Sequence, residues 1–95
     1  MCTYNRRFCL KQAIDSVLCQ TYPDFEFVIV DDGSTDGTEE LIKSYQDPRI
    51  RYFKLNRNSF YCYAANQGLY HCQGDYVAFM NSDDAWLPDK LEKQV

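Results

Sequence analysis

Residues 25–34 read FEFVIVDDGS, an apolar run of strand length that ends in two adjacent carboxylates and a glycine turn. The pattern returns near the carboxyl terminus, where YVAFM at residues 76–80 leads into NSDD at residues 81–84. Both runs carry aromatic and branched residues without helical spacing, which predicts buried strands. Carboxylates at the carboxyl ends of such strands lie where open α/β sheets place their ligand crevice.

Helical patterns alternate with these strands. The spacing of apolar residues predicts a helix over about residues 8–19, with Asn5 as its cap. Similar signals predict helices over about residues 36–46 and 61–72 and a last helix that begins near Pro88. Residues 50–55 alternate apolar and basic side chains, which predicts a third, less deeply buried strand.

The order of these elements defines the fold class. Strands that alternate with helices imply right-handed crossovers, and therefore an α/β fold with a mostly parallel sheet and helices on both faces. No linker, internal repeat or low-complexity tract interrupts the chain. Residues 1–95 are therefore expected to form a single domain.

Composition excludes several function classes. The net charge is −4 and no cluster of lysine and arginine is present, which argues against a nucleic-acid partner. Nothing resembles a signal peptide, and no apolar stretch approaches the roughly 20 residues that span a bilayer. The cysteines form no Cys-x-x-Cys pair and are odd in number, which indicates reduced thiols in a cytoplasmic protein. They are Cys2, Cys9, Cys19, Cys62 and Cys72.

The acidic cluster at residues 81–84 has two interpretations. Its carboxylates either cap the helix that begins near Pro88, or share a divalent cation with the phosphates of a nucleotide. Under the predicted topology, the turns at residues 3–5 and 31–34 leave the sheet on the same side. Three polar turns on one edge are hard to explain by capping alone, and they favour a ligand site. Tyr4 offers a face on which a base can stack.

These motifs resemble the amino-terminal half of glycosyltransferase family 2. The resemblance covers nearly the whole chain, in the same order and spacing. It rests on TYNR (3–6), SVLCQTYPDFE (16–26), VDDGSTDGT (30–38), DPRIRY (47–52), NQG (66–68), GDY (74–76), NSDD (81–84) and WLPDKL (86–91).

The resemblance implies a GT-A-type fold that binds a nucleotide-diphospho-sugar. It implies an inverting transfer of the sugar, with UDP as the favoured nucleotide, to a saccharide or lipid acceptor. Cell-wall or polysaccharide biosynthesis, in the cytoplasm at the inner face of the membrane, is the expected setting. The alternatives are a non-catalytic module that binds nucleotide or assembles with another chain, and an unrelated α/β domain of the flavodoxin or receiver type.

Carried over residue by residue, the resemblance assigns candidate roles. Thr3, Tyr4 and Asp32 would hold the base and ribose, and Asp31 would brace its turn. The family's Asp-x-Asp motif would map onto residues 81–83, with Asp83 as the ligand of Mn²⁺ or Mg²⁺. Nucleotide contacts are also expected from two residues of this cluster, Asn81 and Asp84.

The chain also departs from the family pattern. Asn81 stands where the first Asp of the motif is usual, and Phe60 and Ala65 replace a usual Gly and Arg. Measured against the family pattern, only Met1 and Cys2 are expected to represent the first strand, and the half that would carry the general base is expected to be missing. No catalytic residue is therefore assigned, because inverting transfer needs a base within reach of the acceptor hydroxyl. Self-association, or pairing with the missing carboxyl-terminal half, is a further expectation.

Overall fold

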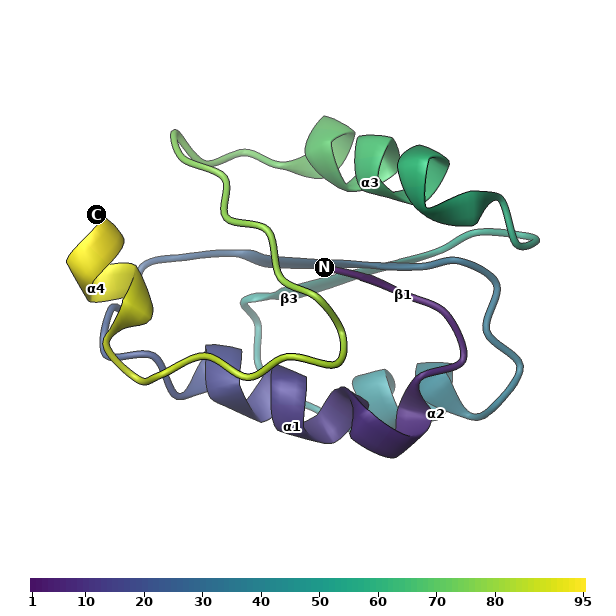
Figure 1. The fold of residues 1–95 in the computed structure, drawn as a ribbon, viewed down its shortest axis with the longest axis horizontal. Coiled ribbons are helices and arrows are strands. Elements are labelled where there is room, and N and C mark those ends of the chain that lie inside the picture. Colours follow the sequence, from purple (N-terminus) through teal and green to yellow (C-terminus); the bar gives the residue numbers. More distant parts are fainter.

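The computed structural model describes all residues, 1–95, and has a parallel sheet at its centre (Figure 1). Its strands lie in the order β1 (Cys2–Thr3), β2 (Phe27–Asp31) and β3 (Ile50–Lys54). The helices are α1 (Arg7–Leu18), α2 (Thr38–Lys43), α3 (Phe60–His71) and α4 (Lys90–Gln94). Helices α1 and α2 cover one face of the sheet and α3 covers the other. The predicted α/β class, with helices on both faces, is confirmed.

Strand β2 is the centre of the core, and all its residues are buried. Phe27 and Ile29 join the cluster that contains the buried residues of α1, whereas Val28 and Val30 pack with Ala64 of α3. A parallel strand covered by helices on both faces needs apolar side chains at every position. That requirement explains why residues 27–30 form an unbroken apolar run.

Helices α1 and α3 begin and end within one residue of their predicted bounds, but α2 is shorter than predicted. Gly37 precedes α2 with a φ of 89°, and the Asp36 carboxylate accepts hydrogen bonds from the amide (3.2 Å) and hydroxyl of Thr38. The predicted cap of α1 is wrong. Arg6 occupies the cap position, because the Asn5 side chain binds the amide of Thr35 instead.

The predicted strand at residues 76–80 does not form. Only Asn81 makes a bridge to β1, through Cys2. In this parallel register, residues 76–79 lie beyond the amino-terminal end of β1 and have no neighbouring strand. Tyr76 and Phe79 are accordingly 84% and 65% exposed. An apolar run becomes a strand only where a partner backbone binds its amides and carbonyls.

Helix α4 is held by the end of α1. The buried Gln20 donates to the carbonyl of Leu87 (2.7 Å) and accepts from the amide of Leu91 (2.9 Å). No carboxylate of residues 81–84 binds an amide of α4, which begins at Lys90. Capping of the last helix by the acidic cluster, one of the two sequence interpretations, is therefore wrong.

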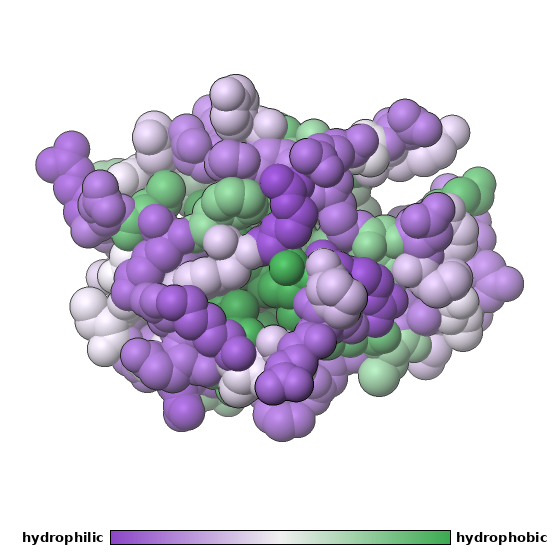
Figure 2. Space-filling model, turned by 180° about the vertical axis from the view of Figure 1, so that it is seen from behind, coloured by the Kyte–Doolittle hydropathy of each residue, from purple (hydrophilic) through white to green (hydrophobic).

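Strand β3 forms an edge of the sheet, and its residues are half-buried or exposed. Figure 2, the view from behind, shows apolar residues across the middle of this side with hydrophilic residues around them. Two basic side chains of β3 are tied by ion pairs, Arg51 to Glu26 (2.6 Å) and Lys54 to Glu39 (2.9 Å). Charged side chains on an edge strand oppose pairing with another sheet.

Candidate functional site

The three polar turns do meet at the carboxyl end of the sheet. In the parallel register Thr3 lies beside Asp31, and Cys2 lies beside both Val30 and Asn81. The chain leaves all three segments at the same edge. This is the position at which open α/β sheets bind ligands.

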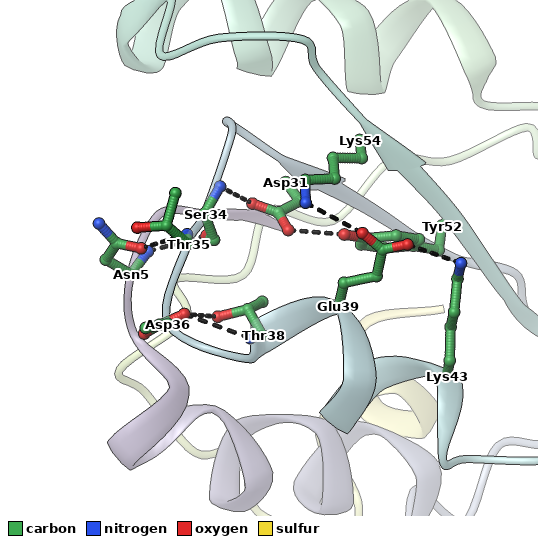
Figure 3. A network of polar contacts seen from close by, with 10 residues as sticks. All are labelled: Asn5, Asp31, Ser34, Thr35, Asp36, Thr38, Glu39, Lys43, Tyr52 and Lys54. Atoms are coloured by element: carbon green, nitrogen blue, oxygen red, sulfur yellow. Dashed lines mark hydrogen bonds and ion pairs between the residues drawn. The ribbon is translucent and has the colours of Figure 1, made fainter.

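The turn after β1 is fastened to the turn after β2 by a pair of hydrogen bonds (Figure 3). The amide of Asn5 donates to Oγ of Ser34 at 2.9 Å, and the amide of Thr35 donates to Oδ1 of Asn5 at 2.9 Å. Asn5 has a φ of 49°, a left-handed conformation that asparagine tolerates better than most residues. The two turns therefore behave as one unit.

Asp31 is completely buried and braces its own turn. Its Oδ1 accepts the amide of Ser34 at 2.9 Å, and its Oδ2 accepts the hydroxyl of Tyr52 at 2.6 Å. Burial and the hydrogen bond to Asp31 raise the pKa of Tyr52 far above its ordinary value. The Tyr52 hydroxyl therefore stays protonated and donates at neutral pH.

Asp32 is buried as well, but only one of its oxygens is used. Its Oδ1 accepts the amide of Ser59 at 2.8 Å, and its own amide donates to the carbonyl of Thr3 at 2.9 Å. Oδ2 accepts no hydrogen bond from the chain. A carboxylate oxygen held in a fixed position with a free lone pair suits an N–H of a bound base.

Thr3 and Tyr4 leave β1 next to Asp32. The Thr3 hydroxyl is the one buried side-chain polar atom without a hydrogen-bond partner. Such atoms are rare in folded proteins, and this one lies in the interior of the chain. The Tyr4 side chain follows it and is 43% exposed, so its ring is accessible for stacking.

The cluster at residues 81–84 forms a turn of its own. The Asn81 amide group donates to Oδ2 of Asp84 at 3.2 Å, and Ser82 is buried. Asp83 is exposed and makes neither a hydrogen bond nor an ion pair. Asp83 therefore has the carboxylate of the cluster that is not engaged by another group of the chain.

A divalent metal fits this cluster only together with a ligand that supplies oxygens. No three His, Cys, Asp or Glu side chains converge on a point that holds an ion by themselves. Mg²⁺ is commonly bound by one or two carboxylates plus water and phosphate oxygens, and Asp83 beside Asp84 offers that donor set. We therefore expect metal affinity to depend on the nucleotide.

Comparisons with known proteins identify the family of this chain. The model of glycosyl transferase family 2 matches residues 1–95. The chain belongs to glycosyl transferase family 2. It is 46% identical over 95 residues to the putative teichuronic acid biosynthesis glycosyltransferase TuaG of Bacillus subtilis, covering 98% of this chain and 38% of that protein. It thus spans little more than a third of that curated relative.

Solved structures extend the family assignment to the fold. The structure of S. aureus TarS 1–349 in complex with UDP-GlcNAc superposes with a TM-score of 0.94 at 30% identity, covering 98% of this chain and 28% of that one. The mannosyltransferase PcManGT from Pyrobaculum calidifontis, in complex with GDP-Man and Mn²⁺, gives a TM-score of 0.82 at 27% identity. It covers 90% of this chain and 26% of that one. The GT-A-type fold is confirmed.

Two of the three departures from the family 2 pattern inside the chain, Phe60 and Ala65, have different consequences. Phe60 stands at a usual glycine position and has a φ of 70°, in the left-handed region that a side chain disfavours. Its ring is 80% exposed and makes no compensating core contact. Ala65, in α3, lines a mostly apolar hollow.

Sequence reasoning missed three residues that shape this family 2 site. The hydroxyl oxygen of Ser34 accepts the amide of Asn5, and the amide of Ser59 donates to Asp32. The hydroxyl of Tyr52 donates to Asp31 from the neighbouring strand. Serine within a turn is too common to signal such a role. Tyr52 shares a sheet face with Asp31, but only the register of β2 and β3 reveals it.

The helices of the chain are all too short or too polar to cross a bilayer. Its five cysteines are free thiols. The cytoplasmic location inferred from sequence stays a prediction.

Proposed function

We propose that this chain binds the donor of a glycosyl transfer, a nucleotide-diphospho-sugar, with UDP as its nucleotide. The observation that carries the proposal is the meeting of three polar turns at the carboxyl end of the sheet, with one Asp32 oxygen unused. The likeness to a structure that holds UDP-GlcNAc supports the choice of donor.

The proposed contacts follow the geometry of the turns. Asp32 accepts a hydrogen bond from the base, and Tyr4 stacks against it. Thr3, whose carbonyl accepts the amide of Asp32 at 2.9 Å, is the third proposed nucleotide contact of these turns. On the other side of β1, Asn81 and Asp84 contact the ribose and phosphate region.

Asp83 is the proposed ligand of Mn²⁺ or Mg²⁺. Its exposed carboxylate has no competing partner in the chain. A bound divalent ion would supply charge neutralisation for the diphosphate. The chain's own contribution is to hold the Asp83 carboxylate within the turn that Asn81 and Asp84 close.

Transfer itself is a further proposal, because the chain spans only part of its relatives. An inverting reaction with a saccharide or lipid acceptor, in polysaccharide or cell-wall synthesis, is supported by family membership and by the name of the TuaG relative. No residue is proposed as its general base. A single domain over residues 1–95 that binds nucleotide without catalysis is the alternative, and it predicts UDP binding without sugar release.

Calorimetric titration with UDP tests donor binding. We expect binding in the presence of Mn²⁺ and at least about tenfold weaker binding without it, a difference of about 1.4 kcal/mol. Asp83→Ala should lose this metal dependence. Asp75→Ala is the matched control, because Asp75 is also exposed and without a hydrogen bond or ion pair but lies outside the turns. Absence of UDP binding with and without Mn²⁺ would reject the proposal, and sugar release from a UDP-sugar would reject the non-catalytic alternative.

Pairing with another copy of the chain is proposed for the opposite side of the molecule. A mostly apolar hollow of about 750 Å³ lies between the edge of β1, α3 and residues 72–80. Tyr76, Phe79 and Tyr61 are exposed at this hollow. Sedimentation over a range of concentrations should show self-association that Phe79→Glu weakens. A monomer at all concentrations would contradict it.

A further inference from the structure

The hydroxyl of Tyr52 binds the carboxylate of Asp31 on the neighbouring strand β2, and no other side chain binds that carboxylate. Tyr52 belongs to the edge strand β3, and its hydroxyl donates to Oδ2 of Asp31 at 2.6 Å (Figure 3). Asp31 forms no ion pair, since the neighbouring Lys54 is bound to Glu39 at 2.9 Å. Tyr52 is therefore the only side-chain donor to this completely buried carboxylate.

From Asp31 the contacts continue into both turns of the proposed nucleotide site. The second Asp31 oxygen accepts the amide of Ser34 at 2.9 Å. Ser34 then accepts the amide of Asn5, and Asn5 accepts the amide of Thr35. The orientation of the Asp31 carboxyl group thus fixes the conformation of Ser34, through which the two turns are joined.

Removal of the Tyr52 hydroxyl would leave half of a buried carboxylate without a donor. Such a group is costly in a dry interior, and it relieves the cost by turning toward water or another amide. Any rotation of Asp31 weakens its bond to Ser34. Removal of the Tyr52 hydroxyl therefore also weakens the hydrogen bonds of the turns, and its effect is not confined to β3.

We propose that Tyr52 is a positioning residue that holds Asp31, and through it the turns at residues 4–5 and 33–35, in the conformation that binds the nucleotide. This inference rests on the proposed function for its effect on binding. The brace itself is a property of the free chain. It assigns a role in ligand affinity to a residue of an edge strand that does not touch the ligand.

The chain offers a matched control. The hydroxyl of Tyr45 donates to Oδ1 of Asp15 at 2.7 Å, so it forms the same kind of bond between the end of α2 and α1. Burial and the bond to Asp15 raise the pKa of Tyr45 as well, so it too is a protonated donor at neutral pH. This pair makes no contact with either turn. Tyr45→Phe therefore removes a Tyr–Asp bond without disturbing the proposed site.

Calorimetry with UDP and Mn²⁺ compares the two variants. Tyr52→Phe should weaken UDP binding about tenfold, whereas Tyr45→Phe should leave it within about twofold. Both variants keep the ring, so circular dichroism should report an unchanged fold. Equal UDP affinity in Tyr52→Phe and the unsubstituted chain, or an equal loss in both variants, would overturn the positioning role.

Amide hydrogen exchange without nucleotide tests the brace independently of UDP. The amide of Ser34 should exchange about tenfold faster in Tyr52→Phe and at an unchanged rate in Tyr45→Phe. Unchanged exchange at Ser34 in Tyr52→Phe would refute the brace. If the unsubstituted chain fails to bind UDP while Ser34 exchange still rises, the proposed function fails and the brace stands.

Discussion

The amide of Ser59 donates a hydrogen bond of 2.8 Å to Oδ1 of the buried Asp32. The loop after β3 is thereby fastened to the turn after β2, which fixes the direction of the carboxyl group. At Gly33 the backbones come close enough that an added Cβ would lie 2.9 Å from the carbonyl carbon of Arg57. The unused Oδ2 of Asp32 is thus presented by a rigid pair of loops.

Asp32→Asn separates the structural oxygen from the proposed ligand oxygen. The amide oxygen can still accept from Ser59, so the melting temperature should change little. The NH₂ group then replaces the free Oδ2, and it repels an N–H of the base. We expect UDP binding to weaken about 10-fold to 100-fold, the cost of an unmatched polar group of about 1–3 kcal/mol. Calorimetry on the folded variant measures it, and unchanged affinity would remove Asp32 from the site.

The strain at Phe60 predicts a stabilising substitution. A non-glycine residue in the left-handed region costs about 1–2 kcal/mol, and the exposed ring regains little of this. Phe60→Gly should therefore raise the free energy of unfolding by about 1 kcal/mol, after allowance for the flexibility of glycine in the unfolded chain. Urea denaturation checks the value. Tyr61→Gly, one residue further into α3, is the control and should destabilise by about 1 kcal/mol.

Local patterns predicted the buried strand β2 and the long helices, because burial on two faces or on one helical face leaves a period in the sequence. The same reasoning failed at residues 76–80. Tyr76 and Phe79 have strand-forming side chains, but strand formation depends on a partner backbone, which a local pattern cannot reveal. Composition is therefore weaker evidence at the edge of a sheet than at its centre.

The candidate site was likewise predictable only in part: the positions of its residues follow from the topology, but their contacts do not. Thr3 ends β1, Asp32 follows β2 and Asn81 forms the bridge to Cys2. The topology alone brings these three residues to one edge. The bond between Tyr52 and Asp31 depends on the register of β2 against β3, where Ile29 lies beside Tyr52. No short sequence window contains that information.

Substitutions of Asn5 can separate the backbone and side-chain contributions of this residue to the stability of the joined turns. Its left-handed φ of 49° suits glycine, whereas its side chain accepts the amide of Thr35. Asn5→Gly should lose only the hydrogen bond and destabilise by about 1 kcal/mol. Asn5→Ala adds backbone strain of about 1 kcal/mol more. Urea denaturation of both variants gives the two values, and a Gly variant less stable than the Ala variant would contradict this division.

The ion pair between Asp47 and Arg49 predicts the acid sensitivity of the fold. Hydrogen bonds from the Arg49 guanidinium, the nearest at 2.7 Å, and from its amide hold the pKa of Asp47 below its ordinary value. A carboxylate with a lowered folded-state pKa stabilises the protein above its unfolded-state pKa, near 3.9. This stabilisation is lost as the pH falls through the folded-state pKa.

Asp47→Asn should therefore reduce stability at pH 7 and flatten the decline of stability below about pH 4. The same guanidinium also binds the carbonyl of Leu18 at 3.3 Å and lies 4.5 Å from the centre of the Phe25 ring, so the pair anchors the end of α1. Urea denaturation at several pH values between about 2.5 and 7 measures the slope. Asp75→Asn is the control, because Asp75 is exposed and makes no hydrogen bond or ion pair. An acid slope that is identical in Asp47→Asn and the unsubstituted chain would assign the acid sensitivity to other carboxylates.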